Sequence, residues 1–199
     1  LAQLQRARDG GQRRLADLRG AVNEYPTIKL RARHDKTWHV CVRDNPQLTS
    51  RTLFANTARF PVISELFIWN DHQNGVLVVP STSMTRDVSI AAAGNAYAGA
   101  DFRGALRHAG GSGTIDLSFN RLTSLTVAGC LQLDNLIVND NPLSAAAVDS
   151  ILEELDQLGT SGGTADLSNT APPTAIGLAY VTSLQARGSE DSGDGGFIE

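Results

Sequence analysis

The sequence predicts an α/β repeat fold: a short β-solenoid with interspersed helices, preceded by an N-terminal helix and a small β cap. Two observations support this prediction. The pentapeptide TIDLS at 114–118 returns as TADLS at 164–168, each time after a glycine-rich cluster. Short apolar-x-apolar pieces also recur at short, nearly constant intervals, interrupted by longer intervals that contain a helical pattern. A strand of three residues cannot bury its face alone, but it can do so when stacked on copies of itself.

The apolar pieces predict the core of the solenoid. They begin at Leu66, Leu77, Val88, Ile115, Leu125, Leu136 and Ala165. The repeat positions among 114–143 are Leu117, Leu125, Val127, Leu136 and Val138. Asparagine after a strand can turn the chain and bond to the backbone of the neighbouring coil, and Asn120 and Asn141 take that place. Cys130 takes the equivalent place, so we expect a buried structural thiol there.

Two helices are predicted between the strand pieces. Apolar residues recur at helical spacing at Phe102, Ala105, Leu106 and Ala109, and again at Val148, Ile151, Leu152, Leu155 and Leu158. Asp101 and Asp149 lie near the expected helix starts, Ser144 is the expected N-cap of the second helix, and glycines end both helices. The acidic stretch Glu153, Glu154 and Asp156 is expected on the solvated face of the second helix.

Residues 114–143, TIDLSFNRLTSLTVAGCLQLDNLIVNDNPL, resemble leucine-rich repeats of the irregular bacterial kind. The match is to the pattern LxxLxLxxN/CxL, and 144–188 resemble the closing unit of such arrays. The resemblance covers roughly residues 66–188. It implies a leucine-rich-repeat-like fold and a place in bacteriophage tail or fibre-like proteins, or in bacterial surface proteins.

The segments around the solenoid predict separate elements. Residues 1–26 show a seven-residue apolar rhythm, which fits either the end of a coiled coil or a single amphipathic helix. Residues 27–65 alternate as strands and are expected to cap the first coil, whereas 189–199 are expected to be mobile. No stretch is long and apolar enough to span a membrane, and the start does not read as a secretory signal.

Charge is distributed unevenly along the chain. Residues 1–60 carry twelve Lys and Arg and five Asp and Glu, a balance of +7, whereas residues 61–199 carry five and sixteen, a balance of −11. The net charge of −4 argues against general nucleic-acid binding by the whole chain. Arg13 and Arg14 belong to the basic first segment, whose charges fit a solvated helix face, docking on an acidic partner such as a neighbouring copy, or a nucleic-acid arm.

No catalytic motif is present, and we expect no enzyme activity, cofactor or metal. His39 and Cys41 lie two residues apart, but with Asp35 they do not make a proven zinc set. Asp116 and Asp140 lack the regular spacing of a calcium loop. A hydrolase with an unrecognised site is one functional hypothesis, and it has less support than the two that follow.

The better functional hint is an aromatic residue beside a polar stretch. Trp69 precedes Asn70, Asp71 and His72, and we expect Trp69, Asn70 and His72 to contact a protein or carbohydrate partner, unless Trp69 packs under the cap. The leading hypothesis is a non-enzymatic structural or recognition protein of a virion appendage. It would bind other virion proteins and form a homo-oligomer through its N-terminal segment. The alternative is a bacterial surface or secreted adhesin.

Overall fold

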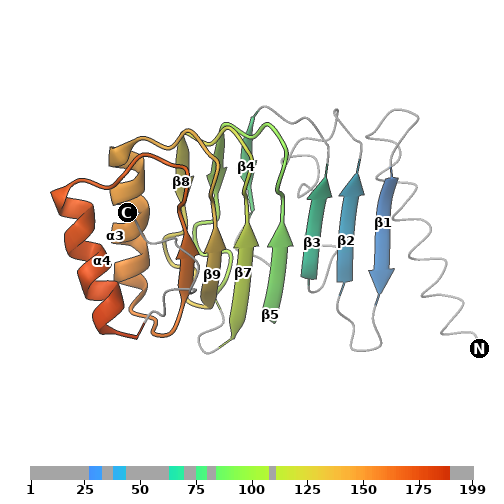
Figure 1. The fold of residues 1–199 in the computed structure, drawn as a ribbon. Helices are drawn as coiled ribbons and strands as arrows, with labels where there is room; N and C mark the ends of the chain where they lie inside the picture. Colours follow the sequence, from blue (N-terminus) through green and yellow to red (C-terminus); the bar gives the residue numbers. More distant parts are fainter. Residues whose placement is uncertain are drawn as a thin grey trace, which may run out of the picture.

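The computed structural model describes residues 27–32, 38–43, 63–69, 75–79, 84–107 and 111–188. The predicted N-terminal helix with Arg13 and Arg14, the tail at 189–199, and the predicted contact residues Asn70 and His72 lie outside these residues. The described chain is an α/β fold with two sheets, in which most strands are parallel, and two helices (Figure 1).

The larger sheet has seven strands in the spatial order β1-β2-β3-β5-β7-β9-β10. These strands are β1 (Thr27–Ala32), β2 (Trp38–Arg43), β3 (Ile63–Trp69), β5 (Met84–Ala91), β7 (Ser112–Asp116), β9 (Leu133–Ile137) and β10 (Thr164–Asp166). β1 pairs with β2 in antiparallel orientation, and every later pair is parallel. The sheet is continuous across residue 65, where the sequence places the end of the cap, because β3 pairs with both β2 and β5.

The smaller sheet has three parallel strands in the order β4-β6-β8 and lies behind the larger sheet in Figure 1. Its strands are β4 (Val76–Val78), β6 (Gly99–Asp101) and β8 (Ser124–Thr126). The helices α3 (Ala145–Leu158) and α4 (Ala175–Ala186) pack together at the end of the array beyond β8 and β10.

From β3 onward the chain alternates between the two sheets, and after β9 the helices take the turn of the smaller sheet. The aligned inward residues of the larger sheet, one from each successive parallel strand, are Leu66, Ile90, Ile115, Leu136 and Ala165. In the smaller sheet the aligned inward residues are Leu77, Ala100 and Leu125. Along the chain, members of the two rows alternate up to Leu136. The short interval between apolar pieces in the sequence is therefore the step from one sheet to the other, and the stacking interval is about twice as long.

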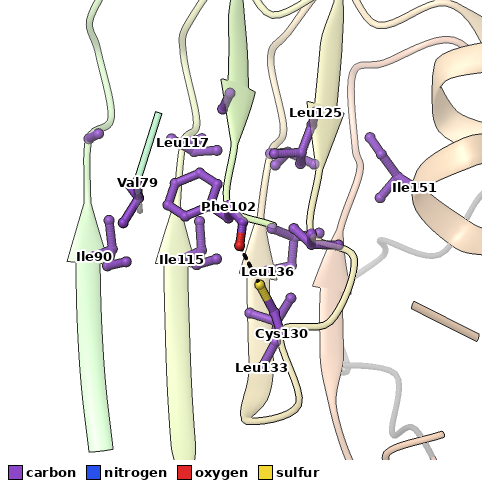
Figure 2. Packing of buried hydrophobic residues seen from close by; sticks show 14 of the residues in the cluster. Val79, Ile90, Phe102, Ile115, Leu117, Leu125, Cys130, Leu133, Leu136 and Ile151 are labelled. Carbon is purple, nitrogen blue, oxygen red and sulfur yellow. Dashed lines mark hydrogen bonds between the residues drawn. The ribbon is translucent and has the colours of Figure 1, made fainter. Parts of the chain in front are cut away.

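The core lies between the two sheets and is mainly aliphatic, as the low aromatic content predicts. Figure 2 shows Ile90, Ile115 and Leu136 from the larger sheet facing Val79, Phe102 and Leu125. Phe102 is the largest of the fully buried side chains. All of the predicted strand pieces contribute buried residues, so the apolar-x-apolar pattern identified the core correctly.

The helix predicted from Phe102 to Ala109 is wrong for the part that the structure describes, because residues 102–107 form turns. Phe102, Ala105 and Leu106 are nevertheless buried. Gly104 adopts a left-handed φ of 60°, and the Ala105 N–H donates to the Phe102 carbonyl at 2.8 Å. The Gly104 N–H donates to the Ala128 carbonyl of the following turn at 2.8 Å, so this segment combines a turn bond with a bond to its neighbour and lacks a helical ladder. The helical spacing of the apolar residues therefore reflects their burial and not the formation of a helix.

The second predicted helix is confirmed as α3. The Ser144 hydroxyl accepts the Ala147 N–H at 3.3 Å, and Gly159 closes the helix in the left-handed conformation. Asp149 does not act at the start of its own helix. Its carboxylate instead accepts the Thr174 N–H at 2.9 Å and the Thr174 hydroxyl, and thus fastens the N-cap of α4 to α3.

The expectation of a solvated acidic face on α3 is wrong for two of its three residues. Glu154 accepts the Val127 N–H at 2.6 Å and the Thr126 hydroxyl at 2.8 Å, and so covers the open edge of β8. Asp156 pairs with Arg187 at 2.8 Å. Glu153 is exposed, as expected, and bonds to Gln157 of its own helix and to the Tyr180 side chain of α4. The acidic stretch therefore joins α3 to the smaller sheet and to the end of α4.

Candidate recognition edge

The chain turns in the same way after four strands of the larger sheet. One residue after each strand adopts a left-handed backbone conformation, with φ of 67° at Gly94, 54° at Phe119, 55° at Asp140 and 56° at Asn169. The next residue along the chain is Asn95, Asn120, Asn141 or Thr170. Each turn therefore has a left-handed position followed by a polar position, at a constant distance along the chain from the aligned inward residue of the strand.

The asparagines at the polar position connect neighbouring turns. The Asn120 Nδ2 group donates to the carbonyls of Ala92 at 2.9 Å, Leu117 at 2.9 Å and Ser118 at 3.2 Å. Its Oδ1 atom accepts the Tyr97 N–H at 3.2 Å. Ala92 and Tyr97 belong to the preceding turn, so one side chain bonds to two successive turns.

The same arrangement is repeated at Asn141 and Asn95. Asn141 Nδ2 donates to the Leu117 carbonyl at 3.0 Å, and its Oδ1 accepts the Leu122 N–H at 2.9 Å. Asn95 Nδ2 donates to the Ile68 carbonyl at 2.9 Å. Sequence reasoning named Asn120 and Asn141 but missed Asn95. The signal was available, because Asn95 follows Ile90 at the same spacing as Asn120 follows Ile115.

Cys130 occupies a different row from the one that the sequence predicts. It follows β8 of the smaller sheet, whereas Asn120 and Asn141 follow strands of the larger sheet. Gly129 before it is left-handed, with φ of 71°, and the Cys130 Sγ donates to the Phe102 carbonyl at 3.0 Å (Figure 2). Cys130 therefore connects its turn to the preceding turn of the smaller sheet through one hydrogen bond, as the asparagines connect successive turns of the larger sheet.

We expect Cys130 to be unreactive in the folded protein. The side chain is fully buried, and this burial raises the pKa of the thiol, which keeps it protonated near neutral pH. In a Cys41→Ser variant, a disulfide reagent such as Ellman's reagent should label Cys130 only after unfolding in denaturant. Labelling of the native variant at the rate of a free small-molecule thiol would contradict the structural role.

Phe119 is the exceptional residue of the left-handed row. Its side chain is 61% exposed, and its neighbours in the row are Gly, Asp and Asn, the residues that tolerate this conformation best. A bulky residue here costs about 1 kcal/mol or more of backbone strain. Its N–H donates to the Asn139 carbonyl at 3.1 Å, which places Phe119 beside the turn after β9.

The polar groups next to Phe119 are fixed by one another. The Asp140 carboxylate accepts the Asn139 side-chain amide at 2.7 Å and the Asn169 side-chain amide at 2.9 Å. We call Phe119, Asn139, Asp140 and Asn169 the recognition edge. It combines one exposed aromatic ring with a preorganised row of planar polar groups, a composition typical of contact surfaces.

The structure places one of the sequence-predicted contact residues at this side of the sheet. Trp69 ends β3, and Ile68 before it is bonded to Asn95 of the next turn. Trp69 thus ends β3 and Phe119 follows β7, the two strands that flank β5, and both strands run in the same direction. The sequence did not single out Phe119, although its place between Ser118 and Asn120, where the other turns have Gly, Asp or Asn, was a usable signal.

Within the described residues, no group of three or more His, Cys, Asp and Glu is placed to hold a metal ion. Asp116 accepts the Ser118 N–H at 3.0 Å and hydroxyl at 2.7 Å, and Asp166 does the same for Ser168. The shared DLS tripeptide is therefore a turn motif. On the smaller sheet, an ion pair with Arg103 lowers the pKa of Asp101, but this exposed pair contributes little to stability.

No family model, curated protein or solved structure matches the chain. None of the helices in the described part is long and apolar enough to cross a bilayer.

Proposed function

We propose that this chain is a non-enzymatic structural and recognition protein, in which a leucine-rich-repeat-like solenoid presents the recognition edge to a partner. The observation that carries the proposal is Phe119, an exposed ring on a backbone conformation that disfavours it. Selection for stability alone would favour Gly, Asp or Asn at this position, as in the other three turns. Retention of Phe at such a position is explained when the ring makes a contact.

The scaffold supports this proposal. Residues aligned from strand to strand, the alternation between two sheets, and the asparagine row are what a solenoid of stacked coils requires. Each coil is fastened to the preceding one by side-chain bonds as well as by the strand ladder. A scaffold of this kind holds contact residues on successive coils at fixed spacing, which favours binding because little conformational entropy is lost.

We place the protein in a virion appendage, where it binds other virion proteins or a receptor and self-associates through its basic N-terminal part. This placement rests on the resemblance of 114–188 to repeats found in phage tail and fibre-like proteins. The alternative is a surface or secreted bacterial adhesin with the same repeats. Density-gradient fractionation of the native source, with mass spectrometry of each fraction, separates the two. The chain should copurify with intact particles, and recovery with the cell envelope alone would favour the adhesin.

Replacement of Phe119 by asparagine tests the recognition role. We expect Phe119→Asn to raise the free energy of unfolding by about 1 kcal/mol, because asparagine adopts the left-handed conformation more readily. The same change should reduce binding of the fluorescently labelled full chain to intact cells of the native source or host at least about tenfold, as flow cytometry can measure.

The matched control is Ile176→Asn on α4, which removes another exposed apolar side chain, 65% accessible, outside the recognition edge. It should leave cell binding unchanged. A Phe119→Asn protein that is more stable and binds cells as well as the unmodified chain would refute recognition through Phe119. A variant that is no more stable would refute the strain argument.

A further inference from the structure

We propose that the recognition edge binds a neutral carbohydrate, with one sugar ring stacked on Phe119 in a space that Gly94 leaves open. This inference rests on the proposed function, because it assigns a class of partner to the same surface. It goes further by naming the chemistry of the partner and the position of one of its rings.

Phe119 lies in a row of side chains whose order is set by the backbone. Gly94, Phe119, Asp140 and Asn169 hold the same left-handed position in successive turns. Backbone hydrogen bonds of 2.9 to 3.1 Å join each of these turns to the next, so the ladder of the larger sheet continues through the row. Neighbouring members of the row are therefore about 4.8 Å apart, the spacing of strands in a sheet. Phe119 thus has Gly94 on one side and Asp140 on the other.

The Gly94 side of Phe119 is open. Gly94 has no side chain, and a Cβ atom added there would have no heavy atom within 4 Å outside its chain neighbours. The exposed Phe119 ring therefore has an unfilled step of the row beside it. The C–H groups of a sugar ring carry a slight positive charge and are attracted to the negative face of an aromatic ring. A sugar ring in this space would lie against Phe119 and over the glycine backbone.

On its other side Phe119 is followed by groups that both donate and accept hydrogen bonds. The Asp140 carboxylate accepts one N–H from Asn139 at 2.7 Å and one from Asn169 at 2.9 Å. Each amide also has a second N–H and a carbonyl oxygen, and the carboxylate oxygens have further lone pairs. A sugar hydroxyl donates and accepts at the same time, so it matches this mixed set of groups.

The surroundings of Phe119 favour a carbohydrate over a protein partner. In the described part of the chain, the other large apolar side chains that are exposed lie on β4, beside Cys130 and on α4. The recognition edge therefore has one apolar ring in a polar row, without the larger apolar centre from which protein interfaces gain most of their affinity. One aromatic ring is enough for the apolar face of a sugar, and the polar groups bind its hydroxyls.

The charges of these turns favour a neutral ligand. Asp116, Asp140 and Asp166 lie at the strand ends and turns of three successive coils, together with one arginine, Arg121. This excess of negative charge opposes an anionic polymer, such as nucleic acid or an acidic polysaccharide. A neutral ligand has no charge for salt to screen, so its binding should depend little on ionic strength.

Cell binding after selective treatment tests the class of partner. The labelled full chain is added to the cells used for Phe119→Asn, which are left untreated, oxidised with sodium periodate to cleave sugar diols, or digested with proteinase K. We expect periodate to reduce binding at least about tenfold and proteinase K to change it less than about twofold. Polysaccharide extracted from the same cells and freed of protein should compete for binding. Binding to untreated cells should differ less than about twofold between about 0.05 M and 0.5 M salt.

Gly94→Asn tests the position of the bound ring. Asparagine tolerates the left-handed backbone, and its side chain would fill the space beside Phe119. We expect this variant to bind cells at least about fivefold more weakly. Gly159→Asn is the matched control, because Gly159 at the end of α3 has the same φ of 67° and equally open surroundings. It should leave binding unchanged, and thermal unfolding reports whether both variants are folded.

The outcomes separate this inference from the proposed function. Binding that requires Phe119 but survives periodate and is lost after proteinase K would keep the recognition edge and overturn the carbohydrate partner. Binding that falls steeply at high salt would overturn a neutral ligand. A folded Gly94→Asn protein that binds as tightly as Gly159→Asn would overturn the stacked position. A full chain that binds none of these cells, or whose binding Phe119→Asn leaves intact, would overturn the proposed function itself and this inference with it.

Discussion

Replacement of Phe102 by alanine is expected to lower the free energy of unfolding by about 4 kcal/mol, the largest effect among single substitutions considered for this protein. The ring is completely buried between the two sheets, and its removal leaves a cavity lined by rigid strands. Stacked strands that are held by ladder bonds on both sides relax little into such a space, so most of the packing energy is lost.

Urea denaturation followed by circular dichroism measures this change. Phe119→Ala is the matched control, because it removes the same atoms from a ring that is 61% exposed, and it should change stability by less than about 0.5 kcal/mol. Equal losses for the two variants would show that Phe102 does not occupy the core as described.

Replacement of Asn120 by alanine is expected to cost about 3 kcal/mol of stability. The side chain is 7% exposed and makes four hydrogen bonds to main-chain groups of two successive turns. Alanine cannot satisfy these groups, and water has little access to replace the lost partner, so the variant bears the penalty of buried polar groups left without that partner.

Asn139→Ala provides the comparison, since the Asn139 side chain bonds to the half-buried Asp140 carboxylate beside it, at the surface of the recognition edge. It should cost less than about 1 kcal/mol by the same denaturation measurement. An Asn120→Ala protein as stable as Asn139→Ala would mean that the asparagine row contributes nothing to holding the turns together.

Much of this fold could be predicted from the sequence because burial leaves a pattern. The strand pieces from Leu66 to Leu167, the helix α3 and its Ser144 cap all follow from apolar spacing and capping chemistry. The same logic failed at residues 102–107, because a turn that buries Phe102, Ala105 and Leu106 produces helical spacing by chance. Gly104, an unfavourable residue inside a helix, was the local warning.

The proposed recognition edge was harder to predict, because it depends on which residues neighbouring turns bring together. Trp69 stands out in the sequence as an aromatic beside polar residues. Phe119 does not, since its left-handed backbone conformation becomes visible only when its turn is aligned with those of Gly94, Asp140 and Asn169. Likewise, the helical pattern predicts an exposed Glu154, and only the structure shows that its carboxylate accepts the Val127 N–H next to β8.

The asparagine row also gives the array a preferred direction of opening. Each asparagine binds the turn before it, so if the β10 turn opens, Asn141 keeps all of its bonds to Leu117, Val138 and Asn139. If an earlier turn opens, the asparagine that follows loses partners. Thr170 strengthens this polarity, because its hydroxyl donates to Leu167 within its own turn. Transient opening should therefore begin at β10 and move toward β3. Protection of the backbone amides from hydrogen exchange should be lowest at β10 and rise from strand to strand toward β3.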